Sequence, residues 1–233
     1  MALPFFYEQL IPETASHFTL SEETSKHCIQ VLRMKTGDTL QLTNGLGTLF
    51  RAGIVSEDKR KTVVLIEEKK QIPTASKKIN IAISLLKNAN RLEWFLEKVT
   101  EIGITEIQPI ICSRTEHQRF RYERMNGILI AAMLQSQRVW LPLLHEPVPF
   151  KDLVRQSVCS QKLIAHCEGE KKQFINQLPA SSDTQILIGP EGDFSAEEIQ
   201  LALTNHYLPV TLGETRLRAE TAGVVAATLL ANR

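Results

Sequence analysis

Apolar residues in the second half of the chain fall into short continuous runs that alternate with stripes at helical spacing. Runs at 79–86, 104–111, 163–166, 185–188 and 207–212 predict strands, and such continuous runs are typical of strands buried on both faces of a parallel sheet. Helices are predicted at 90–102, with Asn90 and Glu93 as a capping box, at 122–137, after Ser195 with Glu198, and at 222–231. Strands that alternate with helices indicate an α/β sheet.

The first 72 residues follow a different pattern. Strands are predicted at 39–43, 49–55 and 62–66, with Asn44-Gly45 as a hairpin turn between the first two. One helix is expected to begin after Ser21, which has the side chain of an N-cap, and to end at Gly37. Residues 73–78 are polar, include Pro73 and have the composition of a linker. We therefore predict a small β-rich domain over 1–72, a linker over 73–78 and an α/β domain over 79–233.

Two of the predicted strands run directly into loops suited to a ligand. The strand at 185–188 precedes Gly189-Pro190-Glu191-Gly192, whose glycines expose backbone N–H and C=O groups. The strand at 207–212 precedes Leu212-Gly213 and a segment that carries Arg218 and Glu220. Ligands of open α/β sheets bind at the carboxyl ends of strands. A single Gly-Pro-x-Gly is most often only a turn, but two such loops close together favour a binding site.

Composition and motif searches exclude several functions. The 233 residues have the composition of an ordinary globular protein with a net charge of +1, so any nucleic-acid-binding surface must be local. The chain has no G-x-G-x-x-G after a strand, no phosphate-binding G-x-x-x-x-G-K-[ST] and no G-x-S-x-G. Cys159, His166 and Cys167 do not have the spacing of a zinc site, so no metal is expected. No apolar run spans a membrane, and we expect a soluble cytoplasmic protein.

The two loops also carry a family resemblance. The segments 188–195 (IGPEGDFS), 212–213 (LG) and 217–222 (LRAETA) resemble the motifs of the RsmE-type 16S rRNA (uracil-N3)-methyltransferases. That family belongs to the SPOUT, or trefoil-knot, class of S-adenosylmethionine-dependent enzymes. Segments 27–38 (HCIQVLRMKTGD) and 97–103 (EKVTEIG) are similar to further family motifs, so the resemblance covers nearly the whole chain. The resemblance implies an N-terminal PUA-like β-barrel followed by a knotted domain. The periodicity of apolar residues alone does not reveal the knot.

The resemblance also implies an activity and a site. The expected reaction is methylation of N3 of a specific uridine in the decoding region of 16S rRNA, with S-adenosyl-L-methionine as cofactor. The cofactor would be held by the ends of three strands, at His166, Cys167, Glu168, Gly189, Pro190, Glu191, Gly192, Leu212, Gly213 and Leu217. Removal of the N3 proton leaves an anion that an arginine can stabilise. The candidate catalytic residues are Arg218, then Arg114, with Glu220 as a possible base.

Partners follow from the same reasoning. The candidates for RNA contact are His27, Arg33, Lys35, Arg119, Arg121 and Arg124. Each has a plainer alternative: a solvated surface for the basic residues, an ion pair with Glu220 or Glu214 for Arg218, and a partner of the helix dipole for Glu220. The helix at 222–231 is apolar nearly all round, which predicts a homodimer with a shared site unless its own domain covers it.

Two other functions remain open. Pro4, Leu134 and Thr215 depart from the family pattern, which would suit an inactive SPOUT-fold RNA-binding or ribosome-assembly factor. A SPOUT methyltransferase with a different rRNA target is a second alternative. An α/β hydrolase ranks last because no nucleophile–base motif is present.

Overall fold

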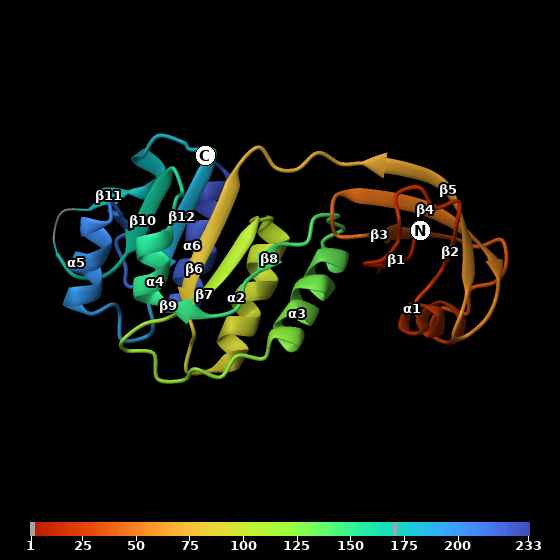
Figure 1. Ribbon diagram of the computed structural model, residues 1–233, viewed down its shortest axis with the longest axis horizontal. Coiled ribbons are helices and arrows are strands. Elements are labelled where there is room, and N and C mark those ends of the chain that lie inside the picture. The colour runs from red at the N-terminus through yellow and green to blue at the C-terminus, as the bar shows by residue number, and fades with distance from the viewer. Residues whose placement is uncertain (1–2, 170–171) are drawn as a thin grey trace. The chain divides into compact units, whose positions relative to one another are not determined.

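The computed structural model describes residues 3–169 and 172–233. The chain divides into two compact units, one formed by Met1–Thr74 with Met133–Leu141 and the other by Ala75–Ala132 with Pro142–Arg233. Each unit contains its own sheet (Figure 1). Among the helices of the described residues, none combines the length and apolar character that crossing a membrane requires.

The first unit is a five-stranded sheet in the order β1-β3-β4-β5-β2. Its antiparallel centre consists of β3 (Thr39–Thr43), β4 (Thr48–Ser56) and β5 (Val63–Gln71). At the two ends of the order, β1 (Phe5–Tyr7) pairs parallel with β3, and β2 (His17–Thr19) pairs antiparallel with β5. The predicted strands are thus present. Their inward side chains form a core that includes Leu40, Leu42, Phe50 and Ile54.

The helix of this unit begins as predicted and ends earlier than predicted. Ser21 is the N-cap of α1 (Glu22–Lys26), and its hydroxyl oxygen accepts from the N–H of Thr24 at 3.3 Å. A π-helical turn, η1 (His27–Val31), continues α1. Arg33 then adopts a left-handed conformation with φ 56°, which ends the helical geometry before Gly37. The prediction that Gly37 stops the helix was therefore wrong, because Gly37 belongs to the turn before β3.

Residues Met133–Leu141 belong to this unit although they lie far along the sequence. The indole N–H of Trp140 donates to the Ile72 carbonyl at 3.1 Å, and the Gly47 N–H donates to the Val139 carbonyl at 2.9 Å. Gly47 has φ 93°, and a Cβ at this position would collide with the Trp140 ring. The first unit therefore requires glycine in its β3–β4 turn in order to accommodate the indole.

The second unit is built on a parallel sheet in the order β11-β13-β10-β12-β6-β7-β8, with β9 also paired to β7. All five predicted strands are present, with shifts of one to two residues at their ends. The strands are β6 (Lys78–Ser84), β7 (Glu106–Ile111), β8 (Leu143–Leu144), β9 (Val148–Pro149), β10 (Gln161–Ala165), β11 (Gln173–Phe174), β12 (Asp183–Ile188) and β13 (Leu208–Thr211).

Helices cover both faces of this sheet (Figure 1). On one face, α2 (Ala89–Ile102) packs against α6 (Ala219–Ala231), and α6 contacts β6 and β12. On the other face, α4 (Phe150–Gln156) and α5 (Ala196–Thr204) share an apolar cluster with side chains of β6, β10 and β12. The remaining helical segments are α3 (Tyr122–Gln135) and the short η2 (Ile175–Gln177).

One predicted cap was misplaced and another was confirmed. Asn88, rather than Asn90, caps α2: its side-chain oxygen accepts from the Asn90 N–H at 3.0 Å, so the helix begins at Ala89. Asn88 has the extended backbone that an N-cap requires, whereas Asn90 is already helical. The capping box of Ser195 and Glu198 is present at α5.

The chain makes a return crossing after β13. Strand β13 lies beyond β10, whereas α6, which follows it, packs against β6 and β12. Residues 212–218 must therefore pass back over the carboxyl ends of β10 and β12, which is the kind of crossing that a knotted topology needs. The parallel sheet with helices on both faces and the small N-terminal β unit confirm the predicted fold class.

Candidate active site

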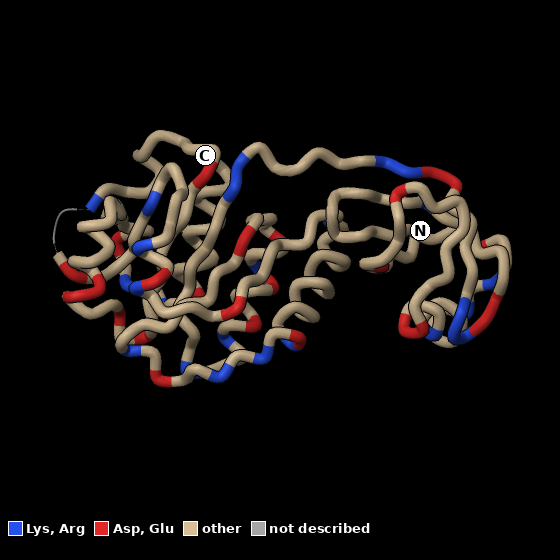
Figure 2. Tube along the Cα trace, viewed as in Figure 1, with Lys and Arg blue, Asp and Glu red and all other residues tan. Residues whose placement is uncertain are grey.

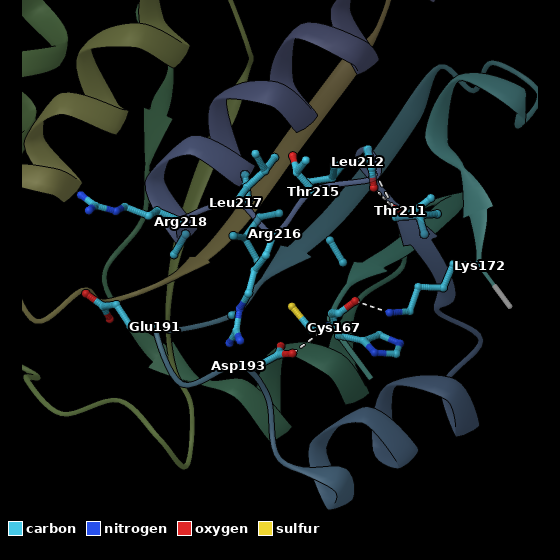
Figure 3. Close-up of a pocket in the computed structure, with 18 of the residues that line it drawn as sticks. Cys167, Lys172, Glu191, Asp193, Thr211, Leu212, Thr215, Arg216, Leu217 and Arg218 are labelled. Atoms are coloured by element: carbon cyan, nitrogen blue, oxygen red, sulfur yellow. Dashed lines mark hydrogen bonds between the residues drawn. The ribbon is translucent and has the colours of Figure 1, made fainter. Parts of the chain in front are cut away.

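A cavity of about 580 Å³ lies at the carboxyl ends of β10, β12 and β13 in the second unit. Its volume is in the range of sites that enclose a cofactor-sized molecule. Three consecutive chain segments after these strands form its walls, as Figure 3 shows. The lining residues are Ala165, His166, Cys167, Lys172, Ile188, Gly189, Pro190, Glu191, Asp193, Val210, Thr211, Leu212, Gly213, Glu214, Thr215, Arg216, Leu217, Arg218, Ala219 and Ala222.

The loop after β12 is held by Arg114. The Arg114 Nη1 donates to the Gly192 carbonyl at 2.7 Å and to the Phe194 carbonyl at 3.3 Å. Phe194 is fully buried, and a Cβ on Gly189 would lie 3.2 Å from its ring. The loop therefore packs tightly on its own phenylalanine, with Arg114 holding its far end. Arg114 does not line the cavity, so its position is that of a residue that supports the wall.

Asp193 joins this loop to the end of β10. Its Oδ2 accepts from the Cys167 N–H at 2.7 Å, and its Oδ1 accepts from the Phe194 N–H at 2.8 Å. The Asp193 N–H donates to the Pro190 carbonyl at 2.9 Å, and φ is 63°. Aspartate tolerates this left-handed backbone better than most residues. These bonds hold the carboxylate rigidly at the cavity wall.

His166 lines the cavity, but its two ring nitrogens are buried. Both ring nitrogens are inaccessible to solvent and have no hydrogen-bond partner among the described residues. Burial lowers the pKa of His166, and the nearby Lys172 cation lowers it further. The Lys172 ammonium donates a hydrogen bond to the His166 backbone carbonyl. The imidazole is thus held neutral at the wall of the cavity.

An arginine of α2 connects two sides of the site. Arg91 Nε lies 3.7 Å from Glu220 Oε1, and Arg91 Nη1 lies 4.0 Å from Glu191 Oε1. Glu191 also accepts from the Lys87 N–H at 3.2 Å. Glu220 is nearly buried, and its Oε2 has no partner among the described residues. Arg91 therefore forms an ion pair with Glu220, the predicted base. The plainer alternative for Arg218 was that it would form this ion pair.

Two arginines of the loop after β13 point in different directions. Figure 3 shows the Arg216 side chain extending toward the side of the cavity where Asp193 lies. Arg218 extends outward past the edge of the cavity. Both side chains are exposed. The outward guanidinium is accessible to a substrate that approaches from solvent.

Most predicted cofactor-binding residues line the cavity. These are His166, Cys167, Gly189, Pro190, Glu191, Leu212, Gly213 and Leu217, and the predicted catalytic Arg218 lines it too. Glu168, Gly192, Arg114 and Glu220 lie nearby but do not line it. Both Glu168 and Gly192 are exposed. Glu168 follows the lining residue Cys167, and Gly192 lies between the lining residues Glu191 and Asp193. Eight of the ten predicted cofactor-binding residues therefore line one cavity.

Sequence reasoning did not select as site residues four charged lining residues, Lys172, Asp193, Glu214 and Arg216. Asp193 follows the glycine loop directly, and Arg216 occupies the second loop, so proximity to those motifs was an available signal. Lys172 gave none, because it lies beyond the end of β10 without a motif. Its place at the site follows from its bond to the His166 backbone carbonyl at the end of β10.

The predicted RNA contacts of the first unit lie on its surface. His27, Arg33 and Lys35 are exposed. The His27 ring meets Phe6 edge-on, with 5.4 Å between ring centroids, and Lys35 Nζ lies 3.5 Å from Glu57. Arg33 has the left-handed backbone described above, which holds its side chain at a sharp turn.

The predicted arginine cluster before α3 is only partly available. Arg124 forms two bonds to Glu93, from Nε at 2.6 Å and from Nη2 at 3.0 Å. Arg119 and Arg121 are exposed. Figure 2 shows acidic residues interspersed with basic ones along this segment. Arg119 and Arg121 are thus better placed for phosphate contact than Arg124.

Two family models match the chain. The one described as RNA methyltransferase domain covers residues 73–231, and the one described as RNA methyltransferase PUA domain covers residues 20–67. Together they account for both the parallel sheet with its cavity and the small N-terminal unit.

Similar proteins extend over nearly the full length. The ribosomal RNA small subunit methyltransferase E of Rickettsia conorii is 29% identical over 91% of this chain and 88% of its own. A probable rRNA-methyltransferase from Porphyromonas gingivalis has a TM-score of 0.90 at 36% identity, covering 97% of this chain and 95% of that one. A putative methyltransferase from Legionella pneumophila, solved with bound S-adenosylmethionine, has a TM-score of 0.87 at 31% identity, covering 99% and 97%.

Proposed function

Because the chain belongs to the RNA methyltransferase family, we propose that it methylates N3 of a specific uridine in the decoding region of 16S rRNA. S-adenosylmethionine is the proposed methyl donor. The observation that carries the proposal is the cavity formed by the three segments after β10, β12 and β13. The name of the Rickettsia conorii relative and the ligand of the Legionella pneumophila structure support the assignment of substrate and cofactor.

The residues present fit this cofactor. The cavity has apolar walls from Ile188, Val210 and Leu217 for a purine and ribose. The backbone N–H and C=O groups of the loops after β12 and β13 supply hydrogen-bond donors and acceptors. When bound there, S-adenosylmethionine supplies an electrophilic methyl group.

The proposed chemistry requires that the uracil N3 proton be removed and the resulting negative charge be stabilised. Arg218 is the preferred cation, because its guanidinium lies at the open edge of the cavity. Arg114 is less suited, since its Nη1 already donates to two carbonyls of the loop. Glu220 stays a candidate base, although its Oε1 lies 3.7 Å from Arg91 Nε in an ion pair that would also suit a structural partner.

RNA would be held by the basic residues that remain accessible. We assign phosphate contacts to Arg119 and Arg121, and further contacts to His27, Arg33 and Lys35 of the first unit. The substrate would be the small ribosomal subunit or a late precursor, and the protein would act in the cytoplasm. We also propose a homodimer, because the outer face of α6 presents half-buried Val224, Val225 and Leu229.

The test is the methylation state of RNA in cells that lack the gene. Mass mapping of 16S rRNA should reveal one unmethylated uridine, and the purified protein with S-adenosylmethionine should restore the methyl group at N3 on isolated small subunits. Loss of methylation at another nucleotide would mean a different RNA target. Absence of S-adenosylmethionine binding in calorimetry would instead favour an inactive RNA-binding or assembly factor.

A further inference from the structure

The charged residues of the cavity are not equivalent, because most already have a task. Lys172 donates to the His166 carbonyl, and Glu191 is engaged by the Lys87 N–H. Arg218 extends outward past the edge of the cavity (Figure 3). Asp193, Glu214 and Arg216 remain. Glu214 and Arg216 lie in the loop after β13 and are both exposed, whereas Asp193 lies in the loop after β12 and its carboxylate is fixed by backbone N–H groups.

The Asp193 carboxylate is preorganised to accept a hydrogen bond from a ligand. Its two carboxylate oxygens each accept one backbone N–H, at 2.7 and 2.8 Å, so both oxygens are fixed in position. A carboxylate oxygen accepts more than one hydrogen bond, and capacity therefore remains on the side that lines the cavity.

Arg216 is the complementary cation. Its side chain points toward the Asp193 side of the cavity (Figure 3). The charges of both residues act on the Cys167 thiol: Asp193 raises the pKa of this group, and Arg216 lowers it. Both therefore lie near the end of β10. Between these two described residues no nitrogen–oxygen distance is 4.0 Å or less, so they do not close into an ion pair.

A separated carboxylate and guanidinium on one wall match a ligand that carries both charges. We propose that Asp193 and Arg216 hold the α-amino-acid end of the cofactor, with its ammonium at Asp193 and its carboxylate at Arg216. This inference rests on the proposed function, since it takes an S-adenosylmethionine-type molecule as the ligand. The apolar part of the cavity then receives the nucleoside, and the pair selects for an intact amino-acid end.

The test compares ligands that differ only at that end. Calorimetry would measure the Kd of S-adenosylmethionine, its decarboxylated analogue and 5′-methylthioadenosine. The full-length protein should bind S-adenosylmethionine about 10- to 100-fold more tightly than the decarboxylated analogue, as expected for a charge-assisted bond. In Arg216→Gln this preference should shrink to about 2-fold or less, with the affinity for 5′-methylthioadenosine unchanged.

Two further variants make the result specific. Arg218→Gln removes the same charge two residues away in the same loop, and it should keep the wild-type preference for the carboxylate. Asp193→Asn should weaken S-adenosylmethionine but not 5′-methylthioadenosine, which lacks the ammonium. Retained 5′-methylthioadenosine binding shows that the loop has kept its shape.

Several outcomes would overturn the inference. An equal loss of all three ligands in Arg216→Gln would mean that Arg216 supports the loop. Unchanged ligand affinities with weaker binding of RNA would assign Arg216 to the RNA. A wild-type protein that binds S-adenosylmethionine and its decarboxylated analogue equally would overturn this inference alone. A protein that binds none of the three would overturn the proposed function together with it.

Discussion

Arg218 and Arg114 carry the same charge near the same loops, but their surroundings assign them different tasks. Arg114 donates through Nη1 to the carbonyls of Gly192 and Phe194, so its guanidinium is committed to the wall. Arg218 is exposed at the edge of the cavity. A cation that stabilises a developing anion has to be free to meet the substrate, and this requirement favours Arg218.

We therefore expect Arg218→Ala to lower the methylation rate by roughly 10²-fold or more, by comparison with the removal of one oxyanion-stabilising donor. The Kd for S-adenosylmethionine should change much less, because the outward guanidinium lies away from the apolar part of the cavity. Single-turnover methylation and calorimetry measure the two quantities separately. If rate and affinity fell by the same factor, Arg218 would be a binding residue or a structural one.

His166 predicts a pH dependence of stability. Burial lowers its pKa in the folded protein below 6.5, the ordinary value of a histidine, so the unfolded chain binds more protons between the two pKa values. Stability should therefore fall as the pH is lowered through 6.5 toward the folded pKa. Denaturant unfolding at pH 7.5 and pH 5.0 should show a smaller loss for His166→Gln than for the wild type. Equal losses would show that His166 is not desolvated.

At the scale of elements, the contact between α2 and α6 depends on one glycine. A Cβ on Gly223 would lie 2.5 Å from Phe95 Cε2 and 2.8 Å from Phe95 Cδ2. Phe95 is fully buried, so its ring has no free space into which it can move. The close approach of these helices holds the start of α6 beside the cavity, where Ala219 and Ala222 form part of the wall.

We expect Gly223→Ala to destabilise the protein by about 1–3 kcal/mol through overpacking. The matched control is Gly127→Ala in α3, where a Cβ would meet nothing within 4 Å. Since alanine is the better helix former, the control should stabilise by about 0.5–1 kcal/mol. Urea unfolding of the two variants provides the comparison. A Gly223→Ala variant as stable as the control would show that α2 and α6 are farther apart than described.

At the scale of the whole molecule, the outer face of α6 is the feature that bears on assembly. The side of α6 that packs on its own unit contains Gly223, Ala226, Ala227 and Leu230. The other side carries half-buried apolar residues, with Thr228 exposed. The helix is therefore covered on one side by its own unit. This is the alternative to a dimer that the sequence left open for this side. The apolar character of the second side is the reason for proposing a dimer.

We expect sedimentation at micromolar concentration to give roughly twice the chain mass of 26.3 kDa. Val225→Glu, which places a charge on the outer face of α6, should shift the protein toward monomer and lower the methylation rate if the site is shared. Gly127→Ala serves as the control for a helix substitution elsewhere. A monomeric wild type that still methylates RNA would contradict both the dimer and the shared site.

Much of the architecture follows from local patterns. The five predicted strands of the second unit are present because continuous apolar runs need burial on both faces. Gly103 ends α2 in a left-handed conformation, and Ser195 with Glu198 forms the predicted capping box, since both signals depend on neighbouring residues alone. The error at Asn90 is also local, because Asn88 was a competing cap two residues away, whereas the left-handed backbone of Arg33 that ends the first helix has no signal in the sequence.

The sequence by itself therefore determined the elements, the two glycine-containing loops and, through their motifs, the family. Only the tertiary structure decided which residues meet at the site. The return crossing after β13 brings Arg216 toward the Asp193 side of the cavity, and α2 delivers Arg91 to Glu220. The physical reason is range: caps, turns and apolar periodicity act over a few residues. The contacts of Arg91 and Arg114 join residues 78 to 129 positions apart and depend on how the strands are ordered in the sheet.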